Sequence, residues 1–369
     1  MQGNSRDEVM TSIEIITERK RKIMRDTMRN FRLDLSGLTV FTEAATGNYL
    51  YTPIMAALSG AEHVFAVTSD SVYGSKEEVK KQILEEASIL GIHDKITVLF
   101  VKDNGCLSVS DIITNLGFVR PITKQMVDWM KPTAVIPFMR LGDEIRAGEI
   151  DLEACRKRSI VVLGTDENHH DLRLLDSTGF KICKLLFERG FSVWSDKLLL
   201  IGSGDLCNYP TYFFMKNDIF INRVIFNDDI PMLQRPLLLT KKQVLKDLSS
   251  YDAIIVNEFY SPISIISDKG FIPVKLLKKM NPSVQIIHLM GNINAEQICR
   301  EGLELYPRNI RPFGYMSVSS DYLGVRCTLK LNAAGLKVAE VASKCRLRGM
   351  SVIETEKYAL RNSPAMRIN

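Results

Sequence analysis

The sequence predicts two doubly wound α/β domains, and three features support this fold class. The chain has 369 residues and a mass of 41.7 kDa, which is more than one hydrophobic core usually supports. Short runs rich in β-branched residues alternate with amphipathic segments in both halves of the chain, which is typical of parallel sheets covered by helices on both faces. A long amphipathic segment, 171–190, separates the two series of runs.

The first series of runs indicates a domain at 35–190, preceded by an N-terminal helical segment at 1–34. Helical patterns such as 75–91 connect the runs. The basic run at 18–32 has acidic and apolar residues at helical spacing, which favours a solvated helix face over a phosphate-binding arm. The expected strands of this domain are 38–44, 63–70, 95–102, 111–117, 134–139 and 159–165.

The second series indicates another α/β domain at 191–325. After it, 326–369 contains one strongly amphipathic pattern, 332–349, and we expect this helix to return to the first domain. The expected strands of the second domain are 197–202, 223–228, 252–259 and 284–291.

Composition limits the classes of partner. The 48 basic and 43 acidic residues give a net charge of +5. This near balance does not indicate the strong positive electrostatic potential that attracts nucleic acids. The chain has no run of about 18 apolar residues, and its first residues lack the charged-then-apolar order of a signal peptide, so we expect a cytoplasmic protein without membrane contact. The seven cysteines are scattered without a C-x-x-C pair, which favours free thiols in a reducing compartment.

The stretch IGSGDLC follows a predicted buried strand and indicates a dinucleotide-binding turn. In such turns the first glycine permits a tight turn, the second lets the backbone approach the pyrophosphate, and the third allows close helix–strand packing. Gly202 and Gly204 fill the first two places, and the small residue Cys207 stands in the third. Asn208 is a candidate N-cap of the following helix, and Pro210 is acceptable in a first turn.

We expect the cofactor to contact this turn and the ends of neighbouring strands. The next predicted strand ends in Asp228, near the place where an acidic residue binds the adenosine ribose, although the spacing slightly exceeds the usual value of about 20 residues. The alternative interpretation is a tight turn whose glycines serve geometry alone. The expected cofactor contacts are Gly202, Ser203, Gly204, Asp205, Leu206, Asp228, Asn257 and Gly291.

With both domains placed, the chain resembles the NAD-dependent formate/glycerate dehydrogenases, the D-2-hydroxyacid dehydrogenases. IGSGDLC and IIHLMGNINAEQI resemble that family as motifs, and most of 35–348 resembles it as an architecture. The resemblance implies a flavodoxin-like substrate domain, a crossover helix, a Rossmann domain that binds NAD and a terminal helix that returns to the first domain. It also implies a dehydrogenase-like oxidoreductase that acts on a small polar hydroxy or oxo metabolite at the interdomain cleft.

The sequence departs from the family at two catalytic positions. In the family, an arginine just before a glycine holds the substrate carboxylate, whereas here Met290 precedes Gly291. The family's acid–base histidine lies in a short segment after a proline, and the comparable segment 311–322 contains no histidine. If the chain binds NAD, its chemistry or its substrate must therefore differ from the family's hydroxyacid reaction, and we expect catalysis to have moved to other residues.

Candidate catalytic residues lie in the loops that follow the strands of the first domain, since ligands of open α/β sheets bind at carboxyl ends of strands. Glu43 follows the first strand, in a loop that fits a capped helix start equally well. Arg120 or Arg140 could replace the missing carboxylate clamp, because a planar guanidinium suits an oxyanion. A lone loop arginine more often forms a surface ion pair.

The densest polar cluster of the sequence is ENHHD, directly after a predicted strand. His169 or His170 is the expected acid–base group, since the unperturbed pKa of histidine lies near neutral pH. The alternative is a polar loop that caps a helix. No metal is expected, because adjacent side chains rarely point at one ion. His288, late on a strand of the second domain, is a second acid–base candidate, with a satisfied buried histidine as the alternative.

Three functions fit these observations. The leading one is an NAD-linked oxidoreductase; the others are an NAD-retaining hydrolase or lyase of adenosylhomocysteinase type and a catalytically inactive NAD-binding scaffold. Asp228 favours NAD over NADP, because a carboxylate accepts from the ribose 2′-hydroxyl, while Arg223 on the same strand argues against this choice. We expect a homodimer, with the N-terminal helix and the crossover segment as candidate surfaces.

Overall fold

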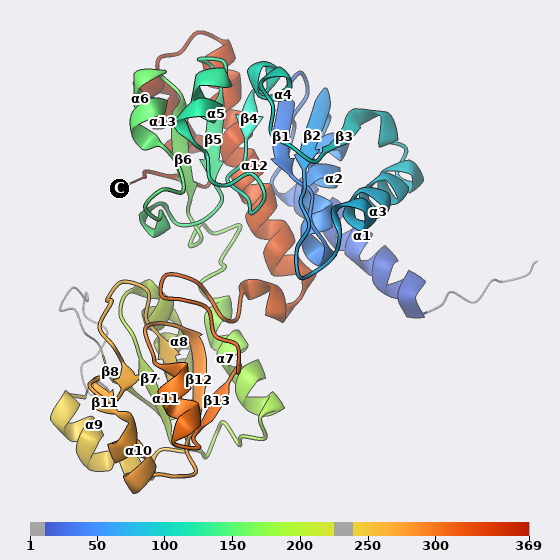
Figure 1. Cartoon of the computed structure of the whole chain (residues 1–369). Helices are drawn as coiled ribbons and strands as arrows, with labels where there is room; N and C mark the ends of the chain where they lie inside the picture. Colours follow the sequence, from blue (N-terminus) through green and yellow to red (C-terminus); the bar gives the residue numbers. More distant parts are fainter. Residues whose placement is uncertain (1–11, 225–238, 369) are drawn as a thin grey trace, which may run out of the picture. The chain divides into compact units, whose positions relative to one another are not determined.

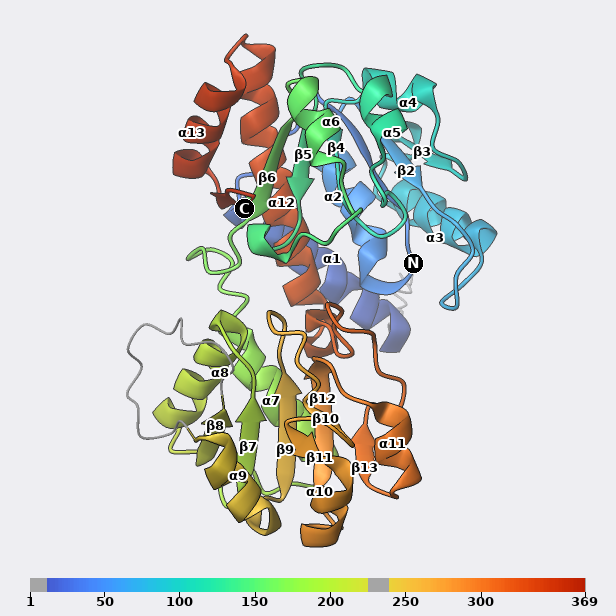
Figure 2. The same ribbon diagram turned by 60° about the vertical axis from the view of Figure 1, so that its left-hand side comes forward.

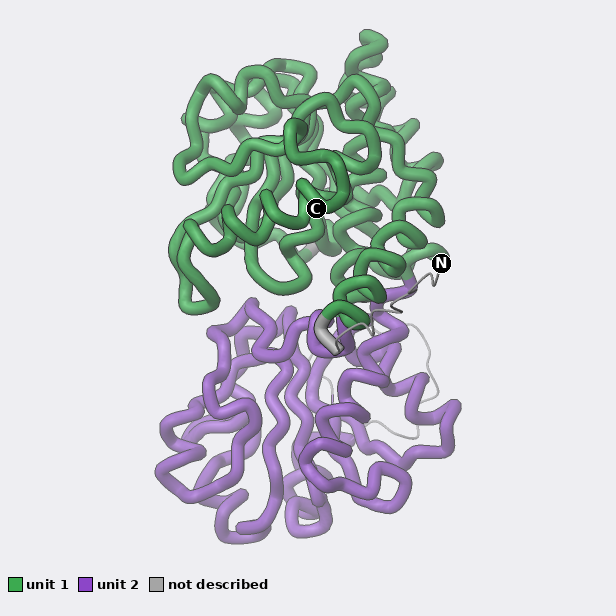
Figure 3. The backbone as a smooth tube through the Cα atoms, turned by 90° about the vertical axis from the view of Figure 1, so that its right-hand side faces the viewer, with its two compact units in different colours: residues 1–172, 325–369 green, residues 173–324 purple. Residues whose placement is uncertain are grey.

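A computed structural model of the chain describes residues 12–224 and 239–368. The chain forms two compact units, shown in green and purple in Figure 3. Unit 1 comprises Met1–Leu172 and Val325–Asn369, and unit 2 comprises Arg173–Gly324. Each unit has a sheet of parallel strands with helices on both faces, to which unit 1 adds one short antiparallel edge strand, so the predicted fold class of two doubly wound α/β domains is confirmed.

Unit 1 is built around a sheet with the strand order β14-β6-β5-β4-β1-β2-β3, of which β1 to β6 are labelled in Figure 1. β14 runs antiparallel to β6. Its helices are α1 Ser12–Asn30, α2 Tyr51–Leu58, α3 Lys76–Ile89, α4 Asn104–Val109, α5 Lys124–Trp129, α6 Leu152–Lys157, α12 Val325–Leu347 and α13 Val352–Asn362. Its strands are β1 Thr39–Glu43, β2 His63–Val67, β3 Ile96–Leu99, β4 Ile112–Ile113, β5 Val135–Phe138, β6 Val161–Thr165 and β14 Ala365–Met366.

Helices cover both faces of the unit 1 sheet (Figure 2). On one face, Leu107, Met126 and Cys155, from α4, α5 and α6, pack in a core with Phe41 and Phe138 of the strands. On the other face, α12 and α13 pack over β5 and β6. Because the strands are buried from both sides, their sequences are continuous apolar runs rather than alternating ones.

The order of the unit 1 strands reverses between β1 and β4. From β1 the chain proceeds to β2 and β3 on one side, and from β4 it proceeds to β5 and β6 on the other. Open α/β sheets bind ligands beyond the carboxyl ends of the strands at such a topological switch point. Glu43 is the last residue of β1, and Thr114 opens the loop after β4.

Unit 2 has a parallel sheet with the order β13-β12-β9-β7-β8, so its switch point lies between β7 and β9. Its helices are α7 Ser177–Glu188, α8 Asp205–Lys216, α9 Lys241–Asp247, α10 Val274–Met280 and α11 Ala295–Arg300. Its strands are β7 Leu198–Ile201, β8 Ile221–Val224, β9 Ala253–Asn257, β10 Ile266–Ser267, β11 Ile272–Pro273, β12 Gln285–Met290 and β13 Glu304–Tyr306.

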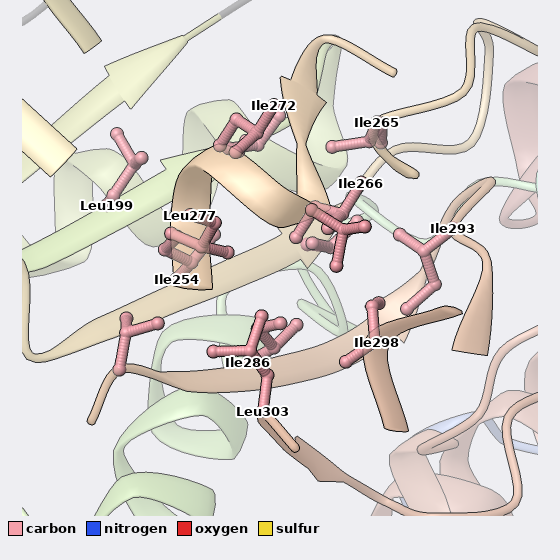
Figure 4. Close-up of a cluster of buried hydrophobic side chains, with 14 of the residues drawn as sticks. Leu199, Ile254, Ile265, Ile266, Ile272, Leu277, Ile286, Ile293, Ile298 and Leu303 are labelled. Carbon is pink, nitrogen blue, oxygen red and sulfur yellow. The ribbon is translucent and has the colours of Figure 1, made fainter. Parts of the chain in front are cut away.

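The central strands of unit 2 are buried on both faces. Leu199 of β7 points into a core with Leu277 of α10 and Ile298 of α11 (Figure 4). The next residue, Leu200, points into the opposite core, which α7 and α8 cover. β7 is thus an interior strand, paired with β9 and β8 and packed on both faces, and the turn that follows it starts from a rigid base.

The boundary between the units differs from the predicted one. The sequence pattern places the crossover segment 171–190 with the first domain, whereas unit 2 begins at Arg173. Packing is the reason, because Ile182 and Leu186 of α7 are buried among side chains of β7, β9 and β12. At the chain end, the predicted helix at 332–349 begins earlier, at Val325, and is followed by α13 and β14, which the pattern did not predict.

The last described residues pack backbone to backbone against the loop that carries Arg140. Met366 pairs with Gly164 of β6, and the N–H of Gly142 lies 3.0 Å from the sulfur of Met366. A Cβ atom at Gly142 would lie 2.0 Å from the carbonyl oxygen of Arg367. Glycine at 142 is thus required by close approach of two chain segments.

We predict that Gly142→Ala destabilises the protein by about 1–3 kcal/mol, the usual cost of overpacking, because the clash is with backbone and cannot be relieved by a rotamer change. Urea denaturation measures the change. Gly105→Ala is the control, since its Cβ would meet a side-chain oxygen, Oδ1 of the N-cap residue Asp103 at 3.0 Å, rather than backbone at 2.0 Å. Equal stability of the Gly142 variant and the native protein contradicts the packing described.

Candidate functional site

The turn after β7 has the geometry that a dinucleotide-binding turn requires. Gly202 approaches β9 so closely that a Cβ there would lie 2.2 Å from the carbonyl oxygen of Asn257. Gly204 has φ +64° and ψ −166°, a conformation that favours glycine, and it is the N-cap of α8. The N-terminus of the 12-residue α8 thus begins directly at the turn, at the unit 2 switch point, where backbone N–H groups and the helix dipole suit an anion.

Cys207 fills the place of the third glycine. Its sulfur donates to the carbonyl oxygen of Asn257 at 3.1 Å and would lie 2.6 Å from a Cβ at Gly202. Burial raises the pKa of the Cys207 thiol to about 12, so the side chain packs as a neutral group. A small residue is needed here for close packing of α8 on the sheet, which is the role predicted from the sequence.

Two expectations about α8 are wrong. Asn208 is not the N-cap, since the helix begins at Asp205, and Pro210 lies inside the helix rather than in its first turn. Pro210 has no N–H to donate to Leu206, whose carbonyl oxygen accepts instead from Nδ2 of Asn257 at 2.6 Å. Asn257 was predicted to contact the cofactor. Its side chain instead donates to a carbonyl oxygen of α8 that Pro210 leaves without its helical hydrogen bond.

Arg223 of β8 points beneath the turn. It is 1% exposed, and its Nη1 donates to Oδ1 of Asn208 at 2.8 Å while Nη2 donates to the carbonyl oxygen of Gly202 at 3.4 Å. The sequence predicts that Arg223 lies on this strand, but it does not predict that the side chain points toward the turn. The side chain is engaged under the turn and is not presented toward a 2′-phosphate.

Tyr260, after β9, covers one side of the turn. A Cβ at Gly204 would lie 2.3 Å from Cε2 of the tyrosine ring. The buried Glu258 orients this segment, because its Oε1 accepts from the N–H groups of Tyr260 at 2.7 Å and Ser261 at 2.8 Å. The tyrosine ring therefore occupies the space beside Gly204.

The remaining predicted contacts of unit 2 have packing or structural roles. Ser203 and Leu206 are buried, whereas Asp205 is exposed in the first turn of α8. Gly291 leaves no room for a side chain, because a Cβ there would lie 2.9 Å from Cγ1 of Val256. Asp228 lies outside the described residues.

His288 is a buried histidine with both ring nitrogens engaged. Its Nδ1 lies 2.9 Å from Oγ of Ser317, and its Nε2 lies 3.0 Å from the carbonyl oxygen of Gly291, to which it donates. Burial lowers the pKa of His288, and the side chain is 0% exposed. This arrangement is that of a satisfied structural histidine.

Glu43 lies at the unit 1 switch point, at the carboxyl end of β1. Its Oε2 accepts from the N–H of Phe118 at 3.1 Å, in the loop after β4. Burial raises the pKa of Glu43 to about 7, and the N–H groups of Phe118 and Gly117 and the charge of Arg120 act in the opposite direction. Glu43 can therefore gain or lose a proton near neutral pH, as an acid–base group must.

Arg120 and Arg140 share one buried carboxylate, that of Glu149. Nη1 of Arg120 donates to Oε1 of Glu149 at 2.6 Å, and Nη2 of Arg140 donates to both of its oxygens, at 2.6 and 2.7 Å. Burial acts to raise the pKa of Glu149, but the hydrogen bond from Arg120 and the two arginine charges outweigh it and hold this pKa below the usual value. The pair of predicted clamps thus forms a single cationic group.

His169 and His170 lie in the loop after β6, three strands away from β1 in the sheet. Asp171 accompanies them, with its Oδ2 at 3.6 Å from Nδ1 of His169 and 3.4 Å from Nε2 of His170. Contrary to the expectation that these adjacent side chains diverge, the three are close enough to share a metal ion. In the described part of the chain, no hydrogen bond or ion pair joins the histidines to Arg120 or Arg140.

We predict that Glu43→Gln removes a loss of stability that the native protein suffers as pH rises. The folded pKa of about 7 lies above the ordinary value of 4.5, so the folded state binds more protons between these values and stability falls as pH rises through this window. The loss is roughly 3 kcal/mol at pH 8, and the variant escapes it. Urea denaturation at pH 4.5 and pH 8 measures the difference.

The control for this prediction is Glu62→Gln, which alters an exposed carboxylate. This variant should keep the native pH profile. If the stability of Glu43→Gln changes with pH in parallel with that of the native protein, Glu43 is ionised in the folded protein at pH 7 without a loss of stability.

Glu149 and Glu258 were not predicted from the sequence. Both are buried carboxylates in loops after strands, and their partners are backbone or arginine groups that lie elsewhere in the chain or in the same loop. The density of charged residues around 140–149 was the available signal for Glu149.

No protein-family model and no curated protein matches the chain. Among solved structures, a dipicolinate synthase chain from Bacillus halodurans is 13% identical with a TM-score of 0.49, over 85% of this chain and 99% of that one. The corresponding dipicolinate synthase chain from Bacillus subtilis is 12% identical with a TM-score of 0.49, over 86% and 98%. The NAD-dependent formate dehydrogenase from Staphylococcus aureus, in complex with NAD, is 14% identical with a TM-score of 0.41, over 81% and 93%.

Proposed function

We propose that the chain is an NAD-dependent oxidoreductase that acts on a small polar hydroxy or oxo metabolite. The observation that carries this proposal is the turn Gly202–Gly204, which lies at the switch point of a parallel sheet and opens directly into the N-terminus of α8. Backbone N–H groups at a helix N-terminus suit the pyrophosphate of a dinucleotide. NAD supplies the acceptor or donor of a hydride, and the chain supplies binding and proton exchange.

The loops of unit 1 are proposed to hold the substrate. Arg120 and Arg140 keep N–H donors beyond those that bind Glu149, and a guanidinium fork suits a carboxylate or another oxyanion. Glu43 lies at the switch point and has a pKa of about 7, and the histidines at 169 and 170 remain the acid–base candidates from the sequence.

A catalytically inactive NAD-binding protein is the second candidate. Two features favour it: Met290 precedes Gly291 where the resembling family has an arginine, and the segment 311–322 contains no histidine. The two candidates differ in a direct measurement. An enzyme reduces added NAD when the right alcohol is supplied, and a binding protein does not.

We further propose a homodimer in the cytoplasm. Aromatic side chains are exposed on the helices of unit 2, with Phe180 and Phe187 on α7 and Tyr212 on α8, and such surfaces are typical of protein–protein contacts. All seven cysteines are free, as suits a reducing compartment. Among the described helices, none is both long enough and apolar enough to cross a membrane.

Calorimetric titration of the purified full chain with NAD tests the cofactor, and a screen of small polyols, hydroxy acids and nucleoside-like alcohols for NAD reduction tests the reaction. Binding at micromolar to low-millimolar concentration together with reduction by one alcohol supports the enzyme. Binding without any reduction favours the binding protein, and no binding contradicts both.

We predict that NAD binds more tightly than NADP, by about tenfold, because Asp228 accepts from the ribose 2′-hydroxyl and repels a 2′-phosphate. The buried position of Arg223 supports this choice, since it removes the cation that opposed it. Competitive titration of the two cofactors measures the ratio. Tighter binding of NADP contradicts the assignment of Asp228.

A further inference from the structure

Arg223 is a buried cation directly beneath the glycine turn. Its two hydrogen-bond acceptors, Oδ1 of Asn208 and the carbonyl oxygen of Gly202, are both neutral, and its Nε has no hydrogen-bond partner in the described residues. Arginine stays ionised in proteins, and burying an ion without a partner costs free energy. The fold therefore retains an incompletely compensated positive charge at this place.

A nearby acid does not cancel this charge by contact. Glu258 is 0% exposed, and its Oε1 accepts hydrogen bonds from the N–H groups of Tyr260 and Ser261. Its Oε2 has no hydrogen-bond partner in the described residues. Within those residues the structure has no salt bridge between Glu258 and Arg223. Burial lowers the pKa of Arg223, and its electrostatic interactions with the side chains of Cys207 and Glu258 act in the opposite direction.

The surface above the turn carries the opposite charge. Asp205 is exposed in the first turn of α8, one residue after Gly204. A carboxylate there stabilises the helix but repels a pyrophosphate that binds at the helix N-terminus. A dinucleotide at this turn thus meets an unfavourable charge from Asp205 and a favourable one from beneath.

We propose that Arg223 is a positioning residue for the dinucleotide, which fixes the shape of the Gly202–Gly204 turn and places beneath it the positive charge that offsets the pyrophosphate. This inference rests on the proposed function, since it requires that the turn bind NAD. It assigns to β8 a role in holding the pyrophosphate, in addition to the ribose contact that the sequence predicts for Asp228, which lies outside the described residues.

The test is calorimetric titration of the full chain with NAD, in variants that change charge at the turn in opposite directions. Arg223→Gln should weaken NAD binding about tenfold, because a unit charge near the pyrophosphate is lost, whereas Arg223→Lys should keep most of the affinity. Asp205→Asn is isosteric and should tighten binding severalfold. Asn222→Ala is the matched control on β8, because Asn222 donates to the hydroxyl of Tyr251 instead, and it should bind as the native chain does.

Titration with adenosine, which lacks the pyrophosphate, distinguishes an effect of the Arg223 charge on the pyrophosphate from a general change in the shape of the binding site. If Arg223 acts through the pyrophosphate, the Gln variant binds adenosine as well as the native chain does. Thermal denaturation identifies a variant that fails to fold, and if Arg223→Gln does so, Arg223→Lys and Asp205→Asn carry the test.

Weaker NAD binding in Arg223→Gln with unchanged adenosine binding, together with tighter binding in Asp205→Asn, supports the proposal. Equal losses for NAD and adenosine, or NAD affinities that do not respond to any of the charge changes, overturn it while leaving the proposed function intact. Absence of NAD binding by the native chain overturns the proposed function and this inference together.

Discussion

Replacing Gly204 by valine abolishes NAD binding in calorimetric titration. Gly204 has φ +64°, where a β-branched residue is strained by about 1–3 kcal/mol, and a Cβ would also lie 2.3 Å from the ring of Tyr260. The turn must therefore change shape, and its N–H groups no longer converge on a pyrophosphate. The clash with Tyr260 also predicts a loss of stability.

Gly190→Val is the matched control, because Gly190 also lies in unit 2 with φ +83° and has no atom within 4 Å of its Cβ position. It carries a similar conformational strain without touching the turn, so it should lose stability but keep NAD binding. A double variant, Gly204→Val with Tyr260→Ala, removes the clash and leaves the strain. Unchanged NAD affinity in Gly204→Val would count decisively against the turn as the cofactor site.

Loss of the acid–base group lowers turnover by about 10²- to 10⁴-fold without weakening NAD binding, which is the usual contribution of positioned proton transfer. The sequence assigns this group to His169 or His170, and the structure adds Glu43 at the switch point, with a pKa of about 7. His169→Ala, His170→Ala and Glu43→Gln are therefore compared in one assay of NAD reduction, with a substrate found by screening.

Each variant tests a different part of the molecule. A loss confined to Glu43→Gln places proton exchange at the switch point, and a loss confined to a histidine variant places it in the loop after β6. His288→Ala is expected to lower stability, because the ring fills a buried site and makes two hydrogen bonds. Full turnover in the other three variants with loss in His288→Ala at equal stability contradicts the assignment to unit 1.

The sheets were predictable from the sequence because parallel strands that are buried on both faces leave continuous apolar runs. The run at 197–202, for example, contains β7, and the run at 134–139 contains β5. Short elements such as β13 and β14 were missed because two or three residues leave no periodic pattern. They are fixed by pairing with β12 and β6 in turn, and the second of these pairings joins distant parts of the chain.

The candidate site was predictable in its residue types and less so in their partners. The glycine turn follows from local backbone needs, which the sequence displays at 202 and 204. The hydrogen bonds of Arg120 and Arg140 to Glu149 depend on how the loops of unit 1 are arranged in the folded protein. The spacing of these residues in the sequence does not predict them. The inward direction of Arg223 is likewise decided by what lies across the sheet.

Because Asn257 donates to the carbonyl oxygen of Leu206, the substitutions that the protein tolerates at position 257 depend on which residue occupies position 210. While Pro210 is present, Asn257 is the group that replaces the missing helical N–H, so its loss leaves a buried carbonyl oxygen unsatisfied. Once another residue stands at 210, the helix supplies that N–H itself, and position 257 becomes freer to vary. The order in which the two positions change therefore matters: a lineage passes more readily through replacement of Pro210 first, and the two sites are epistatic although they lie far apart in the sequence.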